Sequence, residues 1–279
     1  CRPDHPEAVA AAERGLLYKS MPTTVKELFL RDNRSIVIAG THGKTTTTAL
    51  TSYLLSAAGL DPSFLAGGVL ENFGYGYHVG SSDLFVIEGD EYDSAYFEKV
   101  PKFVSYEPFG AVITSVEHDH VDIYPTFEAY KEAFVSFAKL VPEKGVLAVW
   151  AGDPVAVEIA SNSPAQIVTY AVEGDEISGE AEWRGIQIAK GRFDLQLGSD
   201  VATSIESPLI GRHNQRNVLA AMIMCNRVAG VPVDMLAESL KGFKGVRRRQ
   251  QVVASSSGVT ILDDFAHHPT AVRETIRAV

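Results

Sequence analysis

The sequence has few cysteines and no long apolar run, and both absences narrow the possible classes of protein. Its two cysteines, Cys1 and Cys225, lack the spacing of a metal site or of a disulfide framework. No apolar run is long enough to span a bilayer. These features predict a protein of the reducing cytoplasm that has no membrane as a partner. The chain begins at Cys1 rather than at a methionine, so we expect the natural N-terminus to lie further upstream.

Positive charge is also scarce. Lysine and arginine number 25 against 35 acidic residues, which gives a formal net charge of −10 at pH 7. This balance argues against nucleic acid or an anionic membrane surface as the main partner. It leaves nucleotides open, because a basic site can be local on an acidic protein. The 279 residues are enough to bury a substantial core in one large domain or two.

From residue 35 onward, short apolar runs alternate with amphipathic helices, which is typical of an α/β domain. Residues 181–208 instead alternate apolar and polar side chains, and this pattern predicts an antiparallel meander added to the core. The spacing predicts strands at 35–39, 84–88, 111–115, 146–150 and 167–170, and helices at 45–58, 126–140 (with Thr126 as N-cap), 213–229 and 233–240.

The two ends of the chain have the pattern of incomplete units. Residues 1–33 contain two short helices and resemble the tail of a domain plus a linker. A strand at 259–263 and a helix at 269–278 form a βα unit with no strand after it, so we expect a further domain to begin here. The predicted segments are therefore 1–33, 34–253 and 254–279.

The segment Gly40-Thr41-His42-Gly43-Lys44-Thr45-Thr46 follows an apolar run and opens a predicted helix. Backbone N–H groups at a helix N-terminus point at an anion, and the helix dipole favours it. A lysine here reaches the β- and γ-phosphates of a nucleotide, and the next hydroxyl holds Mg²⁺. The common phosphate loop has a glycine where Ile38 stands, so this loop is a short variant. The alternative is a glycine turn with a chance lysine.

Two polar clusters each follow a predicted strand directly. Residues 88–93 hold four carboxylates, of which Glu88 is best placed at the strand end to help bind Mg²⁺. Residues 117–122 hold two histidines and three carboxylates, a set that suits metal coordination. A solvated polar loop is the alternative for each. Because both lie at strand ends beside the phosphate loop, together they favour a two-metal site that bridges nucleotide and substrate.

Three later segments carry further candidates. Asn214 lies near the start of a helix, where it can serve as the N-cap or pair with adenine. The basic run 244–249 can be a solvated loop, a nucleic-acid patch or a charge clamp on a transferring phosphate. Residues 263–269 lie at a strand-to-helix turn and can offer carboxylate and imidazole groups across a cleft.

Taken together, these segments resemble the Mur ligase family, the ATP-dependent amide-bond-forming enzymes of peptidoglycan assembly. The resemblance implies an α/β fold with a P-loop-type central ATPase domain, a mostly parallel sheet and a small antiparallel meander. A UDP-binding domain would end in residues 1–33, and a Rossmann-like C-terminal domain would start at residue 254. The chemistry it implies is phosphorylation of a substrate carboxylate by ATP, followed by attack of an amine on the acyl phosphate. The segments that carry it, in the order of the family, are 40–46, 88–91, 117–122, 213–217, 248–249 and 263–269.

The resemblance also implies ATP and Mg²⁺ as cofactors, together with roles for single residues. Thr45 with Glu88 would bind the first Mg²⁺, and His120 would help hold the second. Arg249 would steady the γ-phosphate, and Asn214 would contact adenine. The implied catalytic residues are Lys44, His120 and Arg249, and the implied nucleotide contacts are Gly40, Thr41, His42, Gly43, Lys44, Thr45, Thr46, Asn214, Arg248, Arg249, Asp264 and His267.

Within the family, residues 91–99 and 102–108 are most similar to the members that recycle murein peptides. This implies UDP-N-acetylmuramate and the tripeptide L-alanyl-γ-D-glutamyl-meso-diaminopimelate as substrates, with no nucleic acid and no membrane as partner. A ligase that adds L-alanine to the same UDP sugar is the alternative, although it usually has Ser where Tyr92 stands. An ATP-binding module without ligase turnover is the alternative of another class.

Two departures from the family pattern bear on the site. The stretch 134–136 lacks the lysine that some members carbamoylate, and Ser115 stands where relatives often have Asn. A folate-polyglutamate ligase would share the loop chemistry, but residues 267–269 and the region of Tyr92 argue against it.

Overall fold

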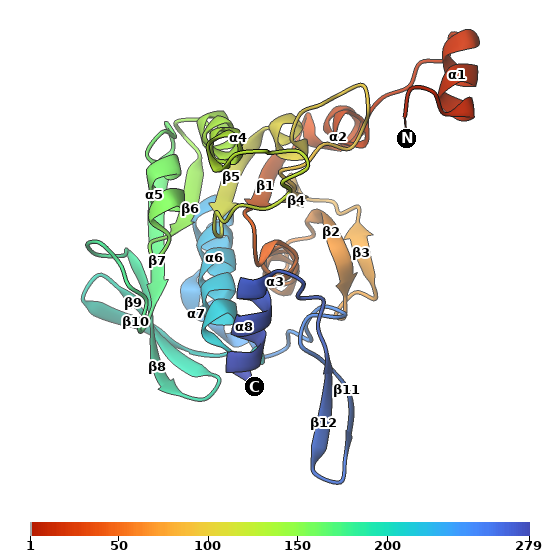
Figure 1. Cartoon of the computed structure of the whole chain (residues 1–279). Coiled ribbons are helices and arrows are strands. Elements are labelled where there is room, and N and C mark those ends of the chain that lie inside the picture. Colours follow the sequence, from red (N-terminus) through yellow and green to blue (C-terminus); the bar gives the residue numbers. More distant parts are fainter. Residues whose placement is uncertain (1) are drawn as a thin grey trace.

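A mixed sheet of ten strands organises the part of the chain that the structure describes, residues 2–279. The structure is a computed structural model (Figure 1). Cys1 lies outside the described residues, so the prediction about its spacing has no structural counterpart. The order across the sheet is β10-β9-β8-β7-β6-β5-β1-β4-β2-β3. The bounds are β1 Arg34–Ala39, β2 Ser63–Leu70, β3 Tyr75–His78, β4 Leu84–Gly89, β5 Pro108–Ile113, β6 Val146–Trp150, β7 Gln166–Val172, β8 Trp183–Ala189, β9 Arg192–Leu197 and β10 Asp200–Glu206.

Strand direction divides this sheet into a parallel centre and antiparallel edges. The neighbouring pairs from β8 through to β2 are all parallel. Strand β3 pairs antiparallel with β2, and β8, β9 and β10 follow one another antiparallel. The predicted mostly parallel sheet and the predicted meander are therefore confirmed. The meander extends the main sheet, because β8 lies parallel to β7.

Helices cover both faces of the sheet, which explains why its central strands are continuous apolar runs. In β1, Ile36 and Ile38 face one core while Val37 and Ala39 face the other, and all four are fully buried. The first core is covered by α3 (Lys44–Ala57), α6 (Arg212–Ala229) and α7 (Val233–Leu240), and the second by α4 (Phe127–Leu140), α5 (Pro154–Ala160) and the 3₁₀ segment η2 (Lys102–Tyr106) (Figure 1).

Local chemistry explains where several elements begin. The side chain of Thr126 accepts a hydrogen bond from the Ala129 N–H, so it caps α4 as predicted. Strand β5 begins at Pro108 and ends at Ile113, earlier than the predicted range 111–115. Proline is tolerated as the first residue of a strand, because its missing N–H then breaks no ladder bond. Residues 114 and 115 lie just beyond this strand, where the Thr114 N–H donates to Ala39 O and Ser115 O accepts from the Thr41 N–H.

The two ends of the chain add smaller elements. Helix α1 (Pro6–Glu13) has no buried residue and lies apart from the sheet, whereas α2 (Met21–Val25) and the π-helical turn η1 (Lys26–Leu30) contribute to the second core (Figure 1). At the other end, β11 (Gln251–Ser256) and β12 (Val259–Asp263) form an antiparallel hairpin, followed by α8 (Pro269–Ala278). Strand β11, which the sequence did not predict, crosses the predicted boundary after residue 253. No described helix is both long enough and apolar enough to cross a membrane.

The topology places the sequence motifs at one edge of the sheet. Strand β1 lies between β4 and β5, so later parts of the chain add strands to the sheet on both sides of β1. In an open parallel sheet, ligands bind beside the carboxyl ends of strands at such a point. The carboxyl ends of β1, β4 and β5 bring together the loops that begin at residues 40, 90 and 114.

Candidate functional site

The loop between β1 and α3 requires glycine at two positions. Gly40 has a φ of 125°, and a Cβ there would lie 2.1 Å from Thr114 Oγ1. Gly43 is the N-cap residue of α3 with a φ of 82°, and a Cβ there would lie 2.4 Å from Asn217 Oδ1. Both positions combine a left-handed backbone with no room for a side chain. The first N–H groups of α3, which have no partner within the helix, follow directly on this turn.

Lys44 is the first residue of α3, and two oxygens hold its ammonium group. Its Nζ donates to Gly40 O at 2.7 Å and to Glu91 Oε2 at 2.9 Å. Glu91 is 1% exposed and also accepts a hydrogen bond from Tyr130 OH at 3.1 Å. A buried carboxylate needs such partners, because an unpaired charge in the interior is costly. The Lys44–Glu91 pair therefore fixes the loop lysine at the end of β1.

His120 also lies beside Glu91. Its Nε2 is 3.5 Å from Glu91 Oε1, and its ring packs on that of Tyr92 with the centroids 4.9 Å apart. Lys102 lies on Tyr92 as well, with Nζ 4.2 Å from the ring centroid and 2.9 Å from Asp90 Oδ2. The structure thus brings His120 to the loop lysine by way of Glu91, while its role as a metal ligand stays a prediction.

Thr45, Glu88 and Arg249 form a second polar group beside the loop. Thr45 Oγ1 donates to Glu88 Oε2 at 3.2 Å, and Arg249 Nη2 donates to Thr45 Oγ1 at 3.2 Å. Burial raises the pKa of Glu88, although the Gly67 N–H donates to its Oε1 at 2.5 Å. Hydroxyl and carboxylate oxygens are the ligands that Mg²⁺ prefers, so these residues fit that ion.

A cavity of about 320 Å³ opens beside the loop, a size in the range of small-molecule sites. Its walls come from the loop after β1, the end of β5, α6, the segment around Arg249, and α8. The predicted site residues in its wall are His42, Gly43, Thr45, Thr46, Asn214, Arg249 and Asp264. The predicted site residues outside its wall are Gly40, Thr41, Lys44, Glu88, His120, Arg248 and His267.

Asn214 lies in the first turn of α6 but is not its cap. Helix α6 begins at Arg212 and its N-cap is Gly211, so the capping alternative for Asn214 is wrong. Asn214 Nδ2 donates to Ile210 O at 2.8 Å and to Gln250 Oε1 at 3.0 Å. Its Oδ1 accepts from Asn217 Nδ2 at 3.1 Å. This amide network fixes the orientation of Asn214 in the cavity wall, and contact with adenine stays a prediction.

The basic run after α7 divides between the loop and the hairpin. Arg249 reaches Thr45, as described above. The guanidinium of Arg248 lies 4.8 Å from the ring centroid of Phe265, and its Nε is 3.6 Å from Asp263 Oδ2. Asp264 fixes the turn that follows, because its carboxylate accepts from the Gln250 N–H and the Ala266 N–H, both at 2.8 Å. Arg249 therefore faces the predicted site, and Arg248 faces the hairpin.

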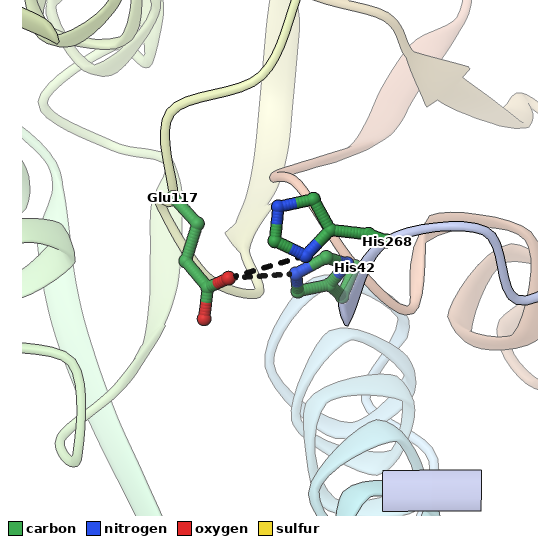
Figure 2. Close-up of side chains that lie close together, drawn as sticks. All are labelled: His42, Glu117 and His268. Carbon is green, nitrogen blue, oxygen red and sulfur yellow. Dashed lines mark hydrogen bonds and ion pairs between the residues drawn. The ribbon is translucent and has the colours of Figure 1, made fainter. Parts of the chain in front are cut away.

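His42, Glu117 and His268 lie close together beside the loop after β1 (Figure 2). His42 Nε2 lies 3.2 Å from Glu117 Oε2, and His268 Nδ1 lies 3.5 Å from the same oxygen. Partial burial is the largest single effect on Glu117 and by itself would raise its pKa. The hydrogen bonds from His42 and Thr270 together outweigh it, so the pKa of Glu117 is lowered. The predicted contact His267 is exposed and its Nδ1 lies 3.0 Å from Phe265 O. The histidine that reaches the loop is therefore His268.

Asp175 holds three side chains of the cavity wall in place by hydrogen bonds. Its side chain is fully buried and accepts from Trp150 Nε1 at 2.7 Å and from Arg212 Nη2 at 2.8 Å. Arg216 also bonds to this carboxylate, and its guanidinium lies 4.0 Å from the ring centroid of Trp150. Trp150 and the two arginines line the cavity. This wall offers an indole ring and cationic groups held in place by one acidic residue.

Sequence reasoning missed several residues of this region. Glu91, Glu117 and His268 lie within clusters that the sequence had identified, but nothing in their spacing distinguished them from their neighbours. Asp175 lies in a turn with no motif, and its importance follows only from its contacts. The local signal was sufficient to find the clusters, and tertiary contacts were needed to choose within them.

Comparison with known proteins gives a consistent family. Residues 38–225 match the model of the Mur ligase middle domain. The chain is 34% identical over 278 residues to UDP-N-acetylmuramate--L-alanyl-gamma-D-glutamyl-meso-2,6-diaminoheptandioate ligase of Escherichia coli K12, covering 99% of this chain and 59% of that protein. It is also 34% identical over 278 residues to UDP-N-acetylmuramate--L-alanine ligase of Mycolicibacterium smegmatis, covering 98% of this chain and 56% of that protein. The chain thus spans a little over half the length of these relatives.

A solved structure supports the same conclusion. The crystal structure of UDP-N-acetylmuramate:L-alanyl-gamma-D-glutamyl-meso-diaminopimelate ligase from Neisseria meningitides superposes with a TM-score of 0.79 at 33% identity. The match covers 88% of this chain and 77% of that chain. The likeness in fold therefore extends over most of the described residues.

Proposed function

Because the chain belongs to the Mur ligase family, we propose that its cavity binds ATP with Mg²⁺ and that the protein uses ATP to join a carboxylate to an amine. One observation carries the proposal. The glycine turn, the Lys44–Glu91 pair with its buried carboxylate, and the Thr45–Glu88 pair converge at the start of α3, beside a cavity of small-molecule size. A triphosphate site needs a helix N-terminus that binds the anion, a lysine that reaches the phosphates, and oxygen ligands for Mg²⁺.

In this proposal each residue group has a separate task. The N–H groups that follow Gly43 and the ammonium of Lys44 bind the phosphates, while Glu91 keeps Lys44 oriented towards the loop. Thr45 and Glu88 would hold Mg²⁺, which when bound neutralises charge on the phosphate oxygens. Arg249 lies 3.2 Å from Thr45 and would stabilise the transferring phosphoryl group. The remaining proposed contacts are Gly40, Thr41, His42, Thr46, Asn214, Arg248, Asp264 and His267 with the nucleotide, and His120 with a second Mg²⁺.

The reaction proposed has two steps with a balanced transfer of atoms. A carboxylate oxygen of the substrate attacks the γ-phosphorus of ATP, and ADP leaves to give an acyl phosphate. The amine nitrogen then attacks the acyl carbon, loses a proton, and expels phosphate as the amide bond forms. The site residues act mainly by positioning and by stabilising charge, which is the usual contribution of a protein to phosphoryl transfer.

For the substrates we propose UDP-N-acetylmuramate and the tripeptide L-alanyl-γ-D-glutamyl-meso-diaminopimelate. The relative from Escherichia coli carries both in its name, and Tyr92, which lies in the segment most similar to such members, contacts both His120 and Lys102. L-alanine is the alternative amine, because the relative from Mycolicibacterium smegmatis is named for it at the same identity.

The proposal is tested with the full gene product, ATP, Mg²⁺ and UDP-N-acetylmuramate, supplied with either the tripeptide or L-alanine. ADP release that depends on the tripeptide supports the proposal, and the amide product is identified by mass. Release with L-alanine alone would assign the protein to the alternative. Absence of ADP release with both amines would contradict ligase activity.

We also propose that the described chain alone is an ATP-binding module without ligase turnover, since it spans little more than half of its relatives. The proposed segments are the end of a UDP-binding domain up to residue 33, the central ATPase domain, and the start of a C-terminal domain. We propose that the central domain ends just before Gln251 rather than at residue 253, because β11 pairs with β12 and not with the main sheet.

A further inference from the structure

Three potential metal ligands come together from distant parts of the sequence. His42 lies in the glycine turn after β1, Glu117 in the loop after β5, and His268 caps the N-terminus of α8 (Figure 2). Their ligand atoms all lie within 4.8 Å of one another. The two histidine rings are also close, with centroids 4.7 Å apart. The cluster therefore joins the phosphate loop to the C-terminal segment.

Two of the three distances already suit a shared metal ion. Metal bonds of about 2.0–2.2 Å to imidazole nitrogen and carboxylate oxygen place ligand atoms roughly 3.3–3.6 Å apart in a tetrahedral site. Glu117 Oε2 lies 3.2 Å from His42 Nε2 and 3.5 Å from His268 Nδ1. Only the separation of the two histidine nitrogens has to adjust. A small rotation of either ring provides this, since both side chains are 23% exposed.

One hydrogen bond of His268 competes with metal binding. Its Nδ1 accepts from the Thr270 N–H at 3.3 Å, so this nitrogen carries no proton, and a metal ion would take over the lone pair that this long bond uses. The Glu117 carboxylate lies 3.5 Å from that nitrogen, so two electron-rich atoms face each other. Neutral imidazoles around an ionised carboxylate are the ligand state that a divalent metal requires.

The donor set distinguishes this cluster from the proposed magnesium site. Thr45 and Glu88 offer only oxygen, which suits Mg²⁺, whereas two imidazoles and one carboxylate suit zinc, nickel or cobalt. Glu117 is 39% exposed, so a metal can enter from solvent and keep a water as its fourth ligand. Nothing in this arrangement requires a nucleotide.

We propose that His42, Glu117 and His268 form a site for a divalent transition-metal ion such as Zn²⁺. The ion bridges the glycine turn and the start of α8, so its binding holds α8 against the cavity that α8 helps to line. None of its ligands is a proposed Mg²⁺ ligand, but His42 and Glu117 also line the cavity proposed for ATP, so the two sites are neighbours.

The test measures Zn²⁺ binding to the described chain by isothermal titration in excess Mg²⁺ and without nucleotide. Co²⁺ serves as a spectroscopic probe, because imidazole ligation gives visible absorption bands. The variants are His268→Asn, which keeps a capping side chain for α8 but removes the imidazole, and Glu117→Gln. The matched control is His267→Asn, which changes the neighbouring exposed histidine.

We expect one equivalent of Zn²⁺, visible Co²⁺ bands, and a rise in Tm with Zn²⁺ in the wild-type chain and in the control. His268→Asn and Glu117→Gln should each weaken binding at least about tenfold, since changes even beyond the ligands cost that much. Absence of stoichiometric binding in the wild-type chain overturns the proposal. Equal affinity in His268→Asn and His267→Asn overturns it as well, because the ion then lies elsewhere.

Discussion

At the scale of single residues, Asp175 shows how one side chain can hold a functional wall. It bonds to Trp150 and Arg216 in the cavity wall, and its side chain is fully buried. Burial by itself would raise the pKa of Asp175, but Arg216, the Val172 N–H and Trp150 outweigh it and lower that pKa. Its charged form is therefore favoured by folding.

We predict that Asp175→Asn lowers the free energy of unfolding by about 3 kcal/mol at neutral pH, because Arg216 is left without its buried partner. A group whose pKa is lowered on folding stabilises the protein above its unfolded-state pKa, and this stabilisation is lost as pH falls through the folded value. The difference between wild type and variant should therefore shrink in acid. Urea unfolding at neutral and acidic pH measures it, with the exposed Asp200→Asn as control.

A difference between wild type and Asp175→Asn that stays constant down to strongly acidic pH would contradict this account. It would mean that the variant acts through packing alone and that the charge of Asp175 contributes nothing. A loss of stability in Asp200→Asn as large as in Asp175→Asn would point to a general charge effect.

At the scale of single residues, the sequence alone could not identify every residue of the candidate site. Lys44 and Thr45 could be assigned to a phosphate loop from local order alone, since the strand, turn and helix follow one another along the chain. Glu91 could not be chosen among four carboxylates, because its burial depends on Tyr130, which lies 39 positions away in sequence. His268 was passed over for His267 for the same reason, as only the fold places one of them against Glu117.

At the scale of elements, helix α3 is flanked at each end by a glycine with a left-handed backbone conformation. Gly43 precedes the helix and Gly59 follows it, and both have a φ of 82°. A Cβ on Gly59 meets nothing within 4 Å, whereas one on Gly43 would lie 2.4 Å from Asn217 Oδ1. Asn217 is held by its bond to Asn214, so it cannot move aside freely.

We predict that Gly59→Ala costs about 1–2 kcal/mol of stability, which is the cost of a left-handed alanine. Gly43→Ala should cost about 1 kcal/mol more, because the Asn217–Asn214 hydrogen bond is also lost. ATP affinity should fall in Gly43→Ala and stay unchanged in Gly59→Ala. Thermal unfolding and ATP titration of the two variants provide the comparison, and equal effects of both on ATP affinity would contradict the role of this turn.

Element prediction succeeded where turn residues bound an apolar run on both sides. Strand β6 and helix α7 have the predicted bounds, since glycine or proline lies beside each of them. Strand β2 was missed because Gly67 and Gly68 interrupt its apolar pattern. Strand β11 was missed because half of it is serine and alanine and its pairing partner is what makes it a strand. The sequence pattern alone therefore identifies those elements whose own residues form a clear apolar run.

At the scale of the whole molecule, the proposed site depends on the sheet order. Strand β1 lies between β4 and β5, so three loops that are far apart in sequence share one edge. Helix α8 lies beside α6 and contributes to the cavity wall (Figure 1). This convergence brings the polar clusters found in the sequence to one edge of the sheet, which no single cluster indicated by itself.

The most direct test of the central proposal is an ATP titration of the described chain with and without Mg²⁺. Because Lys44→Met alone would leave Glu91 buried without its partner, the informative variant is Lys44→Met/Glu91→Gln, which removes both charges. The exposed Lys139→Met serves as the control. We predict one Mg²⁺-dependent equivalent of ATP in the wild type and the control, with affinity at least about tenfold lower in the double variant, a loss of about 1.4 kcal/mol. ATP binding of undiminished affinity in the folded double variant, or no binding in the wild type, would contradict the account.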